Sequence, residues 1–182
     1  MTPLVQNVTT FLSIGIVIVQ VFTIFVLIGF FWKFAARYVL EIGLFITAGS
    51  IIASLFYSNI AGFEPCEFCW WIRIFMYPQA ILFAVALYYK KRQGHIDKVT
   101  TTVALKMSVI GAAIALFQYY GQMFNPNLLS ACVASGPSCA KLYFVSFHYI
   151  TIPMMALTGF VALIVVLVAY KKPLAFDKKI KK

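Results

Sequence analysis

The chain has 182 residues, of which 63% are hydrophobic, 17% are aromatic and only 11% are charged, and its net charge is +10. A soluble domain is typically about 45–50% apolar and about 25% charged, so this composition excludes both an ordinary soluble domain and a disordered chain. It predicts one polytopic membrane domain over residues 1–182. The excess of Lys and Arg does not indicate nucleic-acid binding, because those residues adjoin the apolar runs and suit membrane lipid headgroups.

Five apolar runs are each long enough to cross a bilayer as a helix, which takes about 20 residues. The runs are apolar on all sides, which favours helices over the alternating strands of a membrane barrel, so the predicted fold is an all-α membrane helix bundle. The first run lacks the basic start of a cleaved signal peptide and is expected to remain as an anchor. The expected membrane-spanning helices cover about residues 11–32, 40–62, 70–89, 101–121 and 148–170.

The distribution of basic residues orients these five helices. Most of the 15 Lys and Arg residues follow the first, third and fifth runs, and they therefore share one side of the membrane. The positive-inside rule places that side in the cytoplasm, so the N-terminus and segments 62–69 and 122–148 are expected outside and the C-terminus inside. An odd number of spans also requires the two termini to lie on opposite sides.

All four cysteines lie in the two segments that the charge pattern places outside. Cys66 and Cys69 are in the first of these segments, and Cys132 and Cys139 are in the second. Disulfides persist on that side of a bacterial membrane, so the pattern suggests two disulfides that exchange with each other. The spacing of the second pair disfavours zinc, and Trp70 stands where a haem c motif has His. A purely structural bridge stays open as an alternative.

The first pair forms a C-x-x-C motif where the third expected helix begins. A helix N-terminus favours thiolate, which is the attacking and leaving form in disulfide exchange, so Cys66 and Cys69 are candidate catalytic residues. Arg73 follows Cys69 by one helical turn and is expected on the same face, although it could instead extend to the membrane surface. Gln79 and Gln118 are polar groups within spans that either bond between helices or face a cofactor.

The second pair, Cys132 and Cys139, lies in the long segment that precedes the last expected helix. Pro126, Gly136 and Pro137 predict irregular, mobile backbone there. Such a segment suits docking of a partner protein and movement between two sites.

The run Pro65–Pro78, P-C-E-F-C-W-W-I-R-I-F-M-Y-P, resembles the signature of the disulfide-bond formation protein B (DsbB) family, and in particular its BdbC-like branch. The second cysteine pair, followed by Y-I-T-I-P at 149–153 and L-T-G-F at 157–160, is similar to the same branch. The resemblance covers about residues 40–170. Vitamin K epoxide reductase-like proteins carry the two cysteine pairs in the reverse order. Ser138 departs from the pattern, which has Pro before the last cysteine, and the first helix has no counterpart in it.

The resemblance implies a fold and a function. Family members are four-helix bundles of the bacterial cytoplasmic (inner) membrane, so this chain would have a four-helix core plus one extra N-terminal transmembrane helix. They pass electrons from a secreted thioredoxin-fold oxidase of the DsbA/BdbD type to a membrane quinone, either ubiquinone or menaquinone. We expect this chain to do the same as a monomer.

The resemblance also implies roles for five residues. Cys66–Cys69 would be the quinone-coupled pair, with Cys69 the sulfur nearest the quinone and Arg73 stabilising the quinone and its reduced forms. Cys132–Cys139 would be the shuttle pair, with Cys132 forming the mixed disulfide with the partner. Cys139 would then attack within its own pair or at Cys66. The alternative is a non-enzymatic membrane protein, an accessory subunit or small transporter, whose disulfides only brace the outer segments.

Overall fold

The computed structural model describes residues 2–93, 96, 98–133 and 138–171, and it describes the backbone alone for residues 93 and 130–133. Over these residues the chain is helical, and five helices are long and apolar enough to cross a membrane, as predicted. Two shorter helices, α2 (Trp32–Arg37) and the 3-10 helix η2 (Pro126–Val133), lie near the ends of the bundle. The five long helices are α1 (Pro3–Leu27), α3 (Val39–Leu55, continued by the π-turn η1, Phe56–Ile60), α4 (Glu67–Gln93), α5 (Lys98–Met123) and α6 (Ile152–Lys171).

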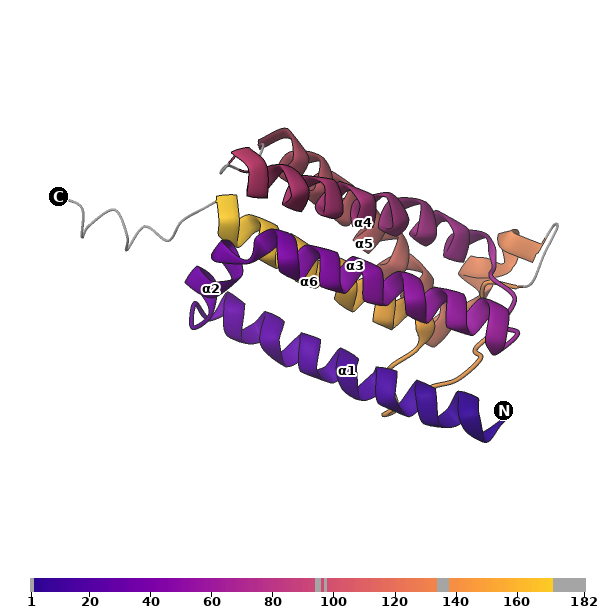
Figure 1. Ribbon diagram of the computed structural model, residues 1–182. Coiled ribbons are helices and arrows are strands. Elements are labelled where there is room, and N and C mark those ends of the chain that lie inside the picture. The colour runs from indigo at the N-terminus through magenta and orange to yellow at the C-terminus, as the bar shows by residue number, and fades with distance from the viewer. Residues whose placement is uncertain (1, 94–95, 97, 134–137, 172–182) are drawn as a thin grey trace.

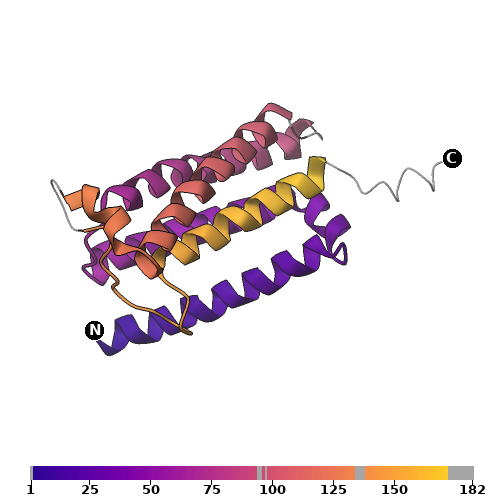
Figure 2. The same cartoon turned by 180° about the vertical axis from the view of Figure 1, so that it is seen from behind.

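Four helices, α3, α4, α5 and α6, form a closed core, and α1 lies along its outside (Figure 1). Around the core, α3 packs on α4, α4 on α5, α5 on α6, and α6 on α3. The N-terminal helices α1 and α2 pack mainly on α6, which the view from behind also shows (Figure 2). The expectation of an all-α membrane bundle with a four-helix core and one additional N-terminal helix is therefore confirmed.

Close contacts between core helices depend on two glycines. A Cβ at Gly111 of α5 would overlap the ring of Phe160 on α6. A Cβ at Gly43 of α3 would lie 2.8 Å from ring carbons of Phe83 on α4. Small residues let membrane helices approach in this way, because packing rather than the hydrophobic effect drives helix association in lipid.

Several helix boundaries differ from those expected: α1 already begins at Pro3, and α4 extends over Glu67–Gln93. At two further boundaries the difference coincides with a positive φ angle. Helix α1 ends at Leu27 rather than near residue 32, because Gly29 adopts a φ of 94° and the chain turns before α2. Helix α6 begins at Ile152 rather than near residue 148, because Phe147 and His148 have φ angles of 50° and 66°. These left-handed conformations are incompatible with a continuous right-handed helix.

The two ends of the bundle differ in chemistry. The start of α1, the α3–α4 connection and the segment before α6 lie together at one end, which carries the C-x-x-C motif (Figure 1). At the other end Glu41 of α3 pairs with Lys90 of α4, with 3.1 Å between carboxylate oxygen and ammonium nitrogen. Further basic residues belong to that second end, where α1 leads into α2, α4 leads into α5 and α6 finishes: Lys33, Arg37, Lys91, Arg92, Lys98 and Lys171.

Candidate active site

The C-x-x-C motif spans the start of helix α4. Cys66 immediately precedes the helix, and its carbonyl accepts the backbone N–H of Trp70, while Cys69 lies in the first turn. The two Sγ atoms are 3.2 Å apart, and both residues are free thiols. A short movement would bring the sulfurs to the bonding distance of about 2.05 Å, so the pair is arranged to open and close a disulfide. The predicted placement of the motif at a helix N-terminus is thus observed.

Hydrogen bonding and burial control the protonation of Cys66. The hydrogen bond between the Cys66 and Cys69 side chains raises the pKa of the Cys66 thiol, and burial of Cys66, which is only 5% exposed, raises it further. A hydrogen bond with Cys139 acts in the same direction. Cys66 therefore keeps its proton at neutral pH and can donate it toward the Cys69 sulfur, which favours negative charge on Cys69.

Gln118 of α5 contacts both sulfurs of the motif. Its Nε2 donates to Cys66 Sγ at 3.3 Å and to Cys69 Sγ at 3.5 Å, and the side chain is 1% exposed. Its Oε1 is buried without a hydrogen-bond partner among the described residues. The sequence left open whether Gln118 bonds between helices or faces a cofactor; it did not predict the contact with the cysteines, because that contact depends on how α5 packs on α4.

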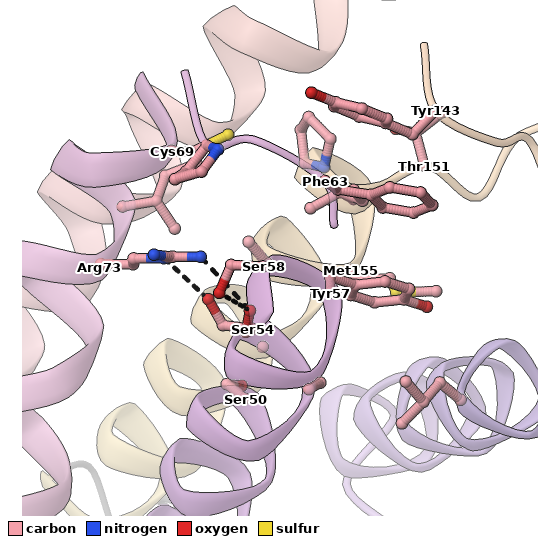
Figure 3. Close-up of a pocket in the computed structure, with 18 of the residues that line it drawn as sticks. Ser50, Ser54, Tyr57, Ser58, Phe63, Cys69, Arg73, Tyr143, Thr151 and Met155 are labelled. Carbon is pink, nitrogen blue, oxygen red and sulfur yellow. Dashed lines mark hydrogen bonds between the residues drawn. The ribbon is translucent and has the colours of Figure 1, made fainter. Parts of the chain in front are cut away.

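Arg73 lies one turn beyond Cys69 on α4, as its spacing predicts. Its Nε donates to Ser54 Oγ at 2.9 Å and its Nη2 to the Ser54 carbonyl at 3.3 Å, while the guanidinium lies 5.2 Å from the Trp70 ring centroid. Tyr77 also donates to Ser54 Oγ, at 3.2 Å. These bonds hold Arg73 against α3 rather than extended to a membrane surface (Figure 3). Ser54 and Tyr77 were not predicted, since their role depends on the register between α3 and α4.

The segment before α6 brings a third cysteine to the motif. Cys139 is 1% exposed and packs with Cys66 and Leu129 in a buried cluster. Gln122 of α5 fixes this segment by donating to the Cys139 carbonyl at 2.8 Å. The backbone of Cys132 belongs to η2, but its side chain lies outside the described residues, so the expected Cys132–Cys139 pair stays a prediction. Three of the four expected redox residues are therefore gathered at one end of the bundle.

A cavity of about 330 Å³ opens beside the motif. Cys69, Arg73 and Gln118 line it at the cysteine end, and apolar side chains of α1, α3 and α6 line the remainder. Near Cys69 it is bordered by the Phe63 ring, which stacks on Tyr143 with 4.5 Å between centroids (Figure 3).

This lining fits a lipophilic electron acceptor that carries hydrogen-bond-accepting oxygens. The cavity volume is within the usual range for small-molecule sites, about 300–1,000 Å³. Arg73 supplies a cation and N–H donors for such oxygens, whereas the unpartnered Gln118 Oε1 can accept only from an oxygen that carries a proton, as after reduction of the acceptor. The remaining walls, from α1, α3 and α6, are mostly apolar and suit the hydrocarbon part of such a molecule.

Together, fold and site define a multi-pass membrane protein built for thiol–disulfide chemistry at one end of a helix bundle. A family model described as "Disulfide bond formation protein DsbB" matches residues 36–170. The chain belongs to this family and is a membrane disulfide oxidoreductase, which disfavours the non-enzymatic alternative.

Individual relatives support the same assignment and agree with the BdbC-like resemblance. Disulfide bond formation protein C of Bacillus subtilis is 36% identical over 118 residues, which are 64% of this chain and 80% of that protein. Probable disulfide formation protein C 2 of Bacillus cereus is 29% identical over 131 residues, 72% of this chain and 89% of that protein. A probable disulfide formation protein of Metapseudomonas resinovorans is 31% identical over 126 residues, 68% and 82% of the two chains. No solved structure matches the chain.

Proposed function

We propose that this protein reoxidises a secreted thioredoxin-fold oxidase of the DsbA/BdbD type and passes the electrons to a membrane quinone. The observation that carries the proposal is the continuity of the site: Cys139 packs on Cys66, Cys66 approaches Cys69 at 3.2 Å, and Cys69 lines the cavity with Arg73. The site has thiols on one side and an apolar cavity on the other. This arrangement suits the transfer of electrons from a soluble dithiol to a lipid-soluble oxidant.

The first exchange takes place between the partner and the outer pair. A thiolate of the reduced partner attacks Cys132 of the Cys132–Cys139 disulfide, so a mixed disulfide forms and Cys139 leaves as thiolate. The second thiol of the partner then attacks the mixed disulfide. The partner departs oxidised, and the outer pair is left as two thiols that hold two electrons.

The second exchange moves those electrons to the inner pair. Cys139 attacks Cys66 of the Cys66–Cys69 disulfide, and Cys69 leaves as thiolate. Gln118 donates to the Cys69 sulfur, and Arg73 lies one turn away, so both stabilise the departing charge. Cys132 then attacks Cys139, which restores the outer disulfide and releases Cys66 as a thiol.

A bound quinone, ubiquinone or menaquinone, supplies the two-electron, two-proton acceptor that side chains do not offer. Arg73 would donate to a quinone oxygen, Gln118 Oε1 would accept from such an oxygen only once it carries a proton, and the apolar walls would exclude water from the reacting sulfur. Cys66, Cys69 and Cys139 all line this cavity, but Cys69 is the least buried of the three and lies one turn from Arg73, so we assign the exit of the electrons to Cys69.

The proposed orientation puts the cysteine end outside the cytoplasmic membrane. It is supported by the basic side chains at the opposite end of the bundle, which the positive-inside rule assigns to the cytoplasm. The orientation is measured by labelling single added cysteines in a cysteine-free variant with a membrane-impermeant maleimide. A cysteine placed next to the α4–α5 connection should react only after the membrane is opened.

The direct test mixes purified protein, a reduced DsbA-type oxidase and either a ubiquinone or a menaquinone analogue, and follows quinone absorbance. We expect two electrons per partner disulfide formed and no turnover with Cys66→Ser. Met107→Leu is the control, because it removes a sulfur eleven residues from Gln118 along α5, about 16 Å at 1.5 Å per residue. Full turnover in Cys66→Ser would overturn the proposal.

The assignment of roles within the outer pair has a separate test. Replacing Cys139 leaves Cys132 as a thiol without its pair, so the partner is supplied in its oxidised form. The Cys132 thiol then attacks the partner disulfide, releases one partner thiol and should hold the partner on Cys132 as a disulfide adduct. The adduct is visible on a non-reducing gel and disappears on reduction. Its absence, together with an adduct in a Cys132→Ser variant, would reverse the roles of the two cysteines.

A further inference from the structure

The cavity beside Cys69 extends well beyond the reacting cysteines. Away from the cysteines it runs between α1 and α3, with α6 as the third wall. Every side chain that α1 contributes is apolar, as are most of those from the other two helices. The α1 wall consists of Phe11, Leu12, Gly15, Ile16 and Val19.

Helix α1 is an addition to the family fold, because the family match begins at residue 36. It is nevertheless fixed in place by hydrogen bonds. Gln20 donates to Thr158 of α6 at 3.0 Å and accepts from Tyr149 at 2.9 Å. Nearer its start, Thr9 accepts from Tyr57 at 3.4 Å. The additional helix is thus a positioned wall of the cavity.

Two facing glycines leave space open between α1 and α3. Gly15 and Gly49 both line the cavity, and a Cβ at either position would meet no atom within 4 Å. Small residues on membrane helices normally allow close helix contact, as Gly111 does against Phe160. Here α1 packs mainly on α6 instead, and the glycines border empty space.

We propose that α1 and α3 form a groove for the isoprenoid tail of the acceptor quinone, with Gly15 and Gly49 keeping the groove open. This inference rests on the proposed function, because it places the quinone ring at Cys69 and Arg73. One cavity joins the charged end to the apolar groove, so its chemistry matches an amphipathic molecule with a compact polar head and a hydrocarbon chain. The groove would make the extra helix a determinant of quinone affinity.

The test measures equilibrium binding rather than turnover. The Trp70 ring centroid lies 5.2 Å from the Arg73 guanidinium, so quenching of tryptophan fluorescence reports quinone binding in detergent. The ligands are a tail-free quinone, ubiquinone-0, and a tailed one, ubiquinone-2. The variants are Gly15→Leu and Gly49→Leu, whose Cβ atoms would meet no atom within 4 Å and which improve helix propensity, so both should fold. Val21→Trp adds bulk to an exposed position of α1 outside the cavity and is the control.

We expect each glycine variant to weaken ubiquinone-2 binding by ~10-fold, which is about 1.4 kcal/mol, and to leave ubiquinone-0 binding unchanged. Val21→Trp should bind both ligands as the wild type does. Unchanged ubiquinone-2 affinity, equal weakening of both ligands, or displacement of the tail by phosphatidylglycerol at equal concentration would overturn the groove and leave the proposed function standing. A wild-type protein that binds neither these ubiquinones nor the menaquinone analogue of the turnover assay would overturn both.

Discussion

Two buried glutamines on neighbouring helices occupy contrasting environments. Gln79, in the middle of α4, has both ends of its amide satisfied by protein: Nε2 donates to the Phe75 carbonyl at 2.8 Å, and Oε1 accepts from Ser108 at 2.9 Å. Gln118, near the cysteine end of α5, gives its Nε2 to two sulfurs and leaves Oε1 without a partner among the described residues.

The difference separates a structural polar contact from a site. A buried amide costs stability unless it is paired, so Gln79, which has a protein partner at each end of its amide, joins α4 to α5 and lies outside the cavity lining. Gln118 keeps an unpaired hydrogen-bond acceptor in a region of free thiols. A buried polar atom is left unpaired in this way where a bound ligand or a reacting group supplies the missing partner. Buried polarity alone does not mark function in this bundle, and neither does incomplete pairing, since Glu41 Oε2 is also unpaired among the described residues. Gln118 is distinguished because its side chain also contacts the reacting sulfurs.

Removing the reacting sulfur should have the largest effect. Cys69→Ser is expected to lower quinone-dependent turnover by at least ~1,000-fold, because a serine hydroxyl neither forms nor leaves a disulfide. Its thermal unfolding should stay close to that of the wild type, because the hydroxyl keeps the place of the thiol. Turnover and unfolding are measured on the same preparation. A variant that keeps a tenth of its turnover would remove Cys69 from the electron path.

Arg73→Ala should have the next largest effect, through quinone binding. It removes a cation from the cavity wall and should raise the apparent quinone KM by ~10-fold, since hydrogen bonds to charged groups contribute about 1.5–3 kcal/mol. Ser54→Ala is the matched variant, because it removes an anchor of Arg73 and keeps the charge. It should raise KM by less. An unchanged KM in Arg73→Ala would show that the cation acts elsewhere.

Gln118→Leu tests the incompletely paired glutamine. The two thiols lose their common donor, so the rate of electron transfer at saturating quinone should fall by ~10-fold. Stability should change by less than about 0.5 kcal/mol, because the substitution also removes an unpaired buried oxygen. A large loss of stability with an unchanged rate would make Gln118 a structural residue like Gln79.

Gln79→Leu should give the opposite pattern and the smallest effect on function. It leaves the Ser108 hydroxyl without its acceptor, and we expect a loss of about 1 kcal/mol of stability, with turnover within about twofold of the wild type. Unfolding is followed by circular dichroism in detergent. Normal stability with impaired turnover would erase the contrast between the two glutamines.

The sequence predicted the elements of this site better than their contacts. Uncharged runs were enough to find five helices, and a four-residue spacing was enough to align Arg73 with Cys69, because both depend only on local helix geometry. Ser54 and the contact of Gln118 with the cysteines escaped prediction, because they depend on the register between α3, α4 and α5. That register follows from side-chain packing such as the contact of Gly43 with Phe83, which no single segment encodes.

The segment before α6 shows the same limit. Its cysteines were expected on the same side as the C-x-x-C motif, and Cys139 does lie against Cys66. The late start of α6 was not expected, because left-handed conformations at Phe147 and His148 are unusual for residues with large side chains. The expected pairing of Cys139 with Cys132 stays a prediction.

The burial of the sulfurs has a consequence for selectivity. Cys66 and Cys139 expose 5% and 1% of their surfaces, so a small thiol diffusing in the surroundings meets protein rather than sulfur at these positions. In the proposed reaction Cys66 and Cys139 are therefore shielded from low-molecular-weight reductants, whereas Cys69 faces the cavity that the membrane oxidant would fill. Restricted access to these two buried sulfurs would then contribute to the fidelity of electron flow between docked partner and membrane oxidant.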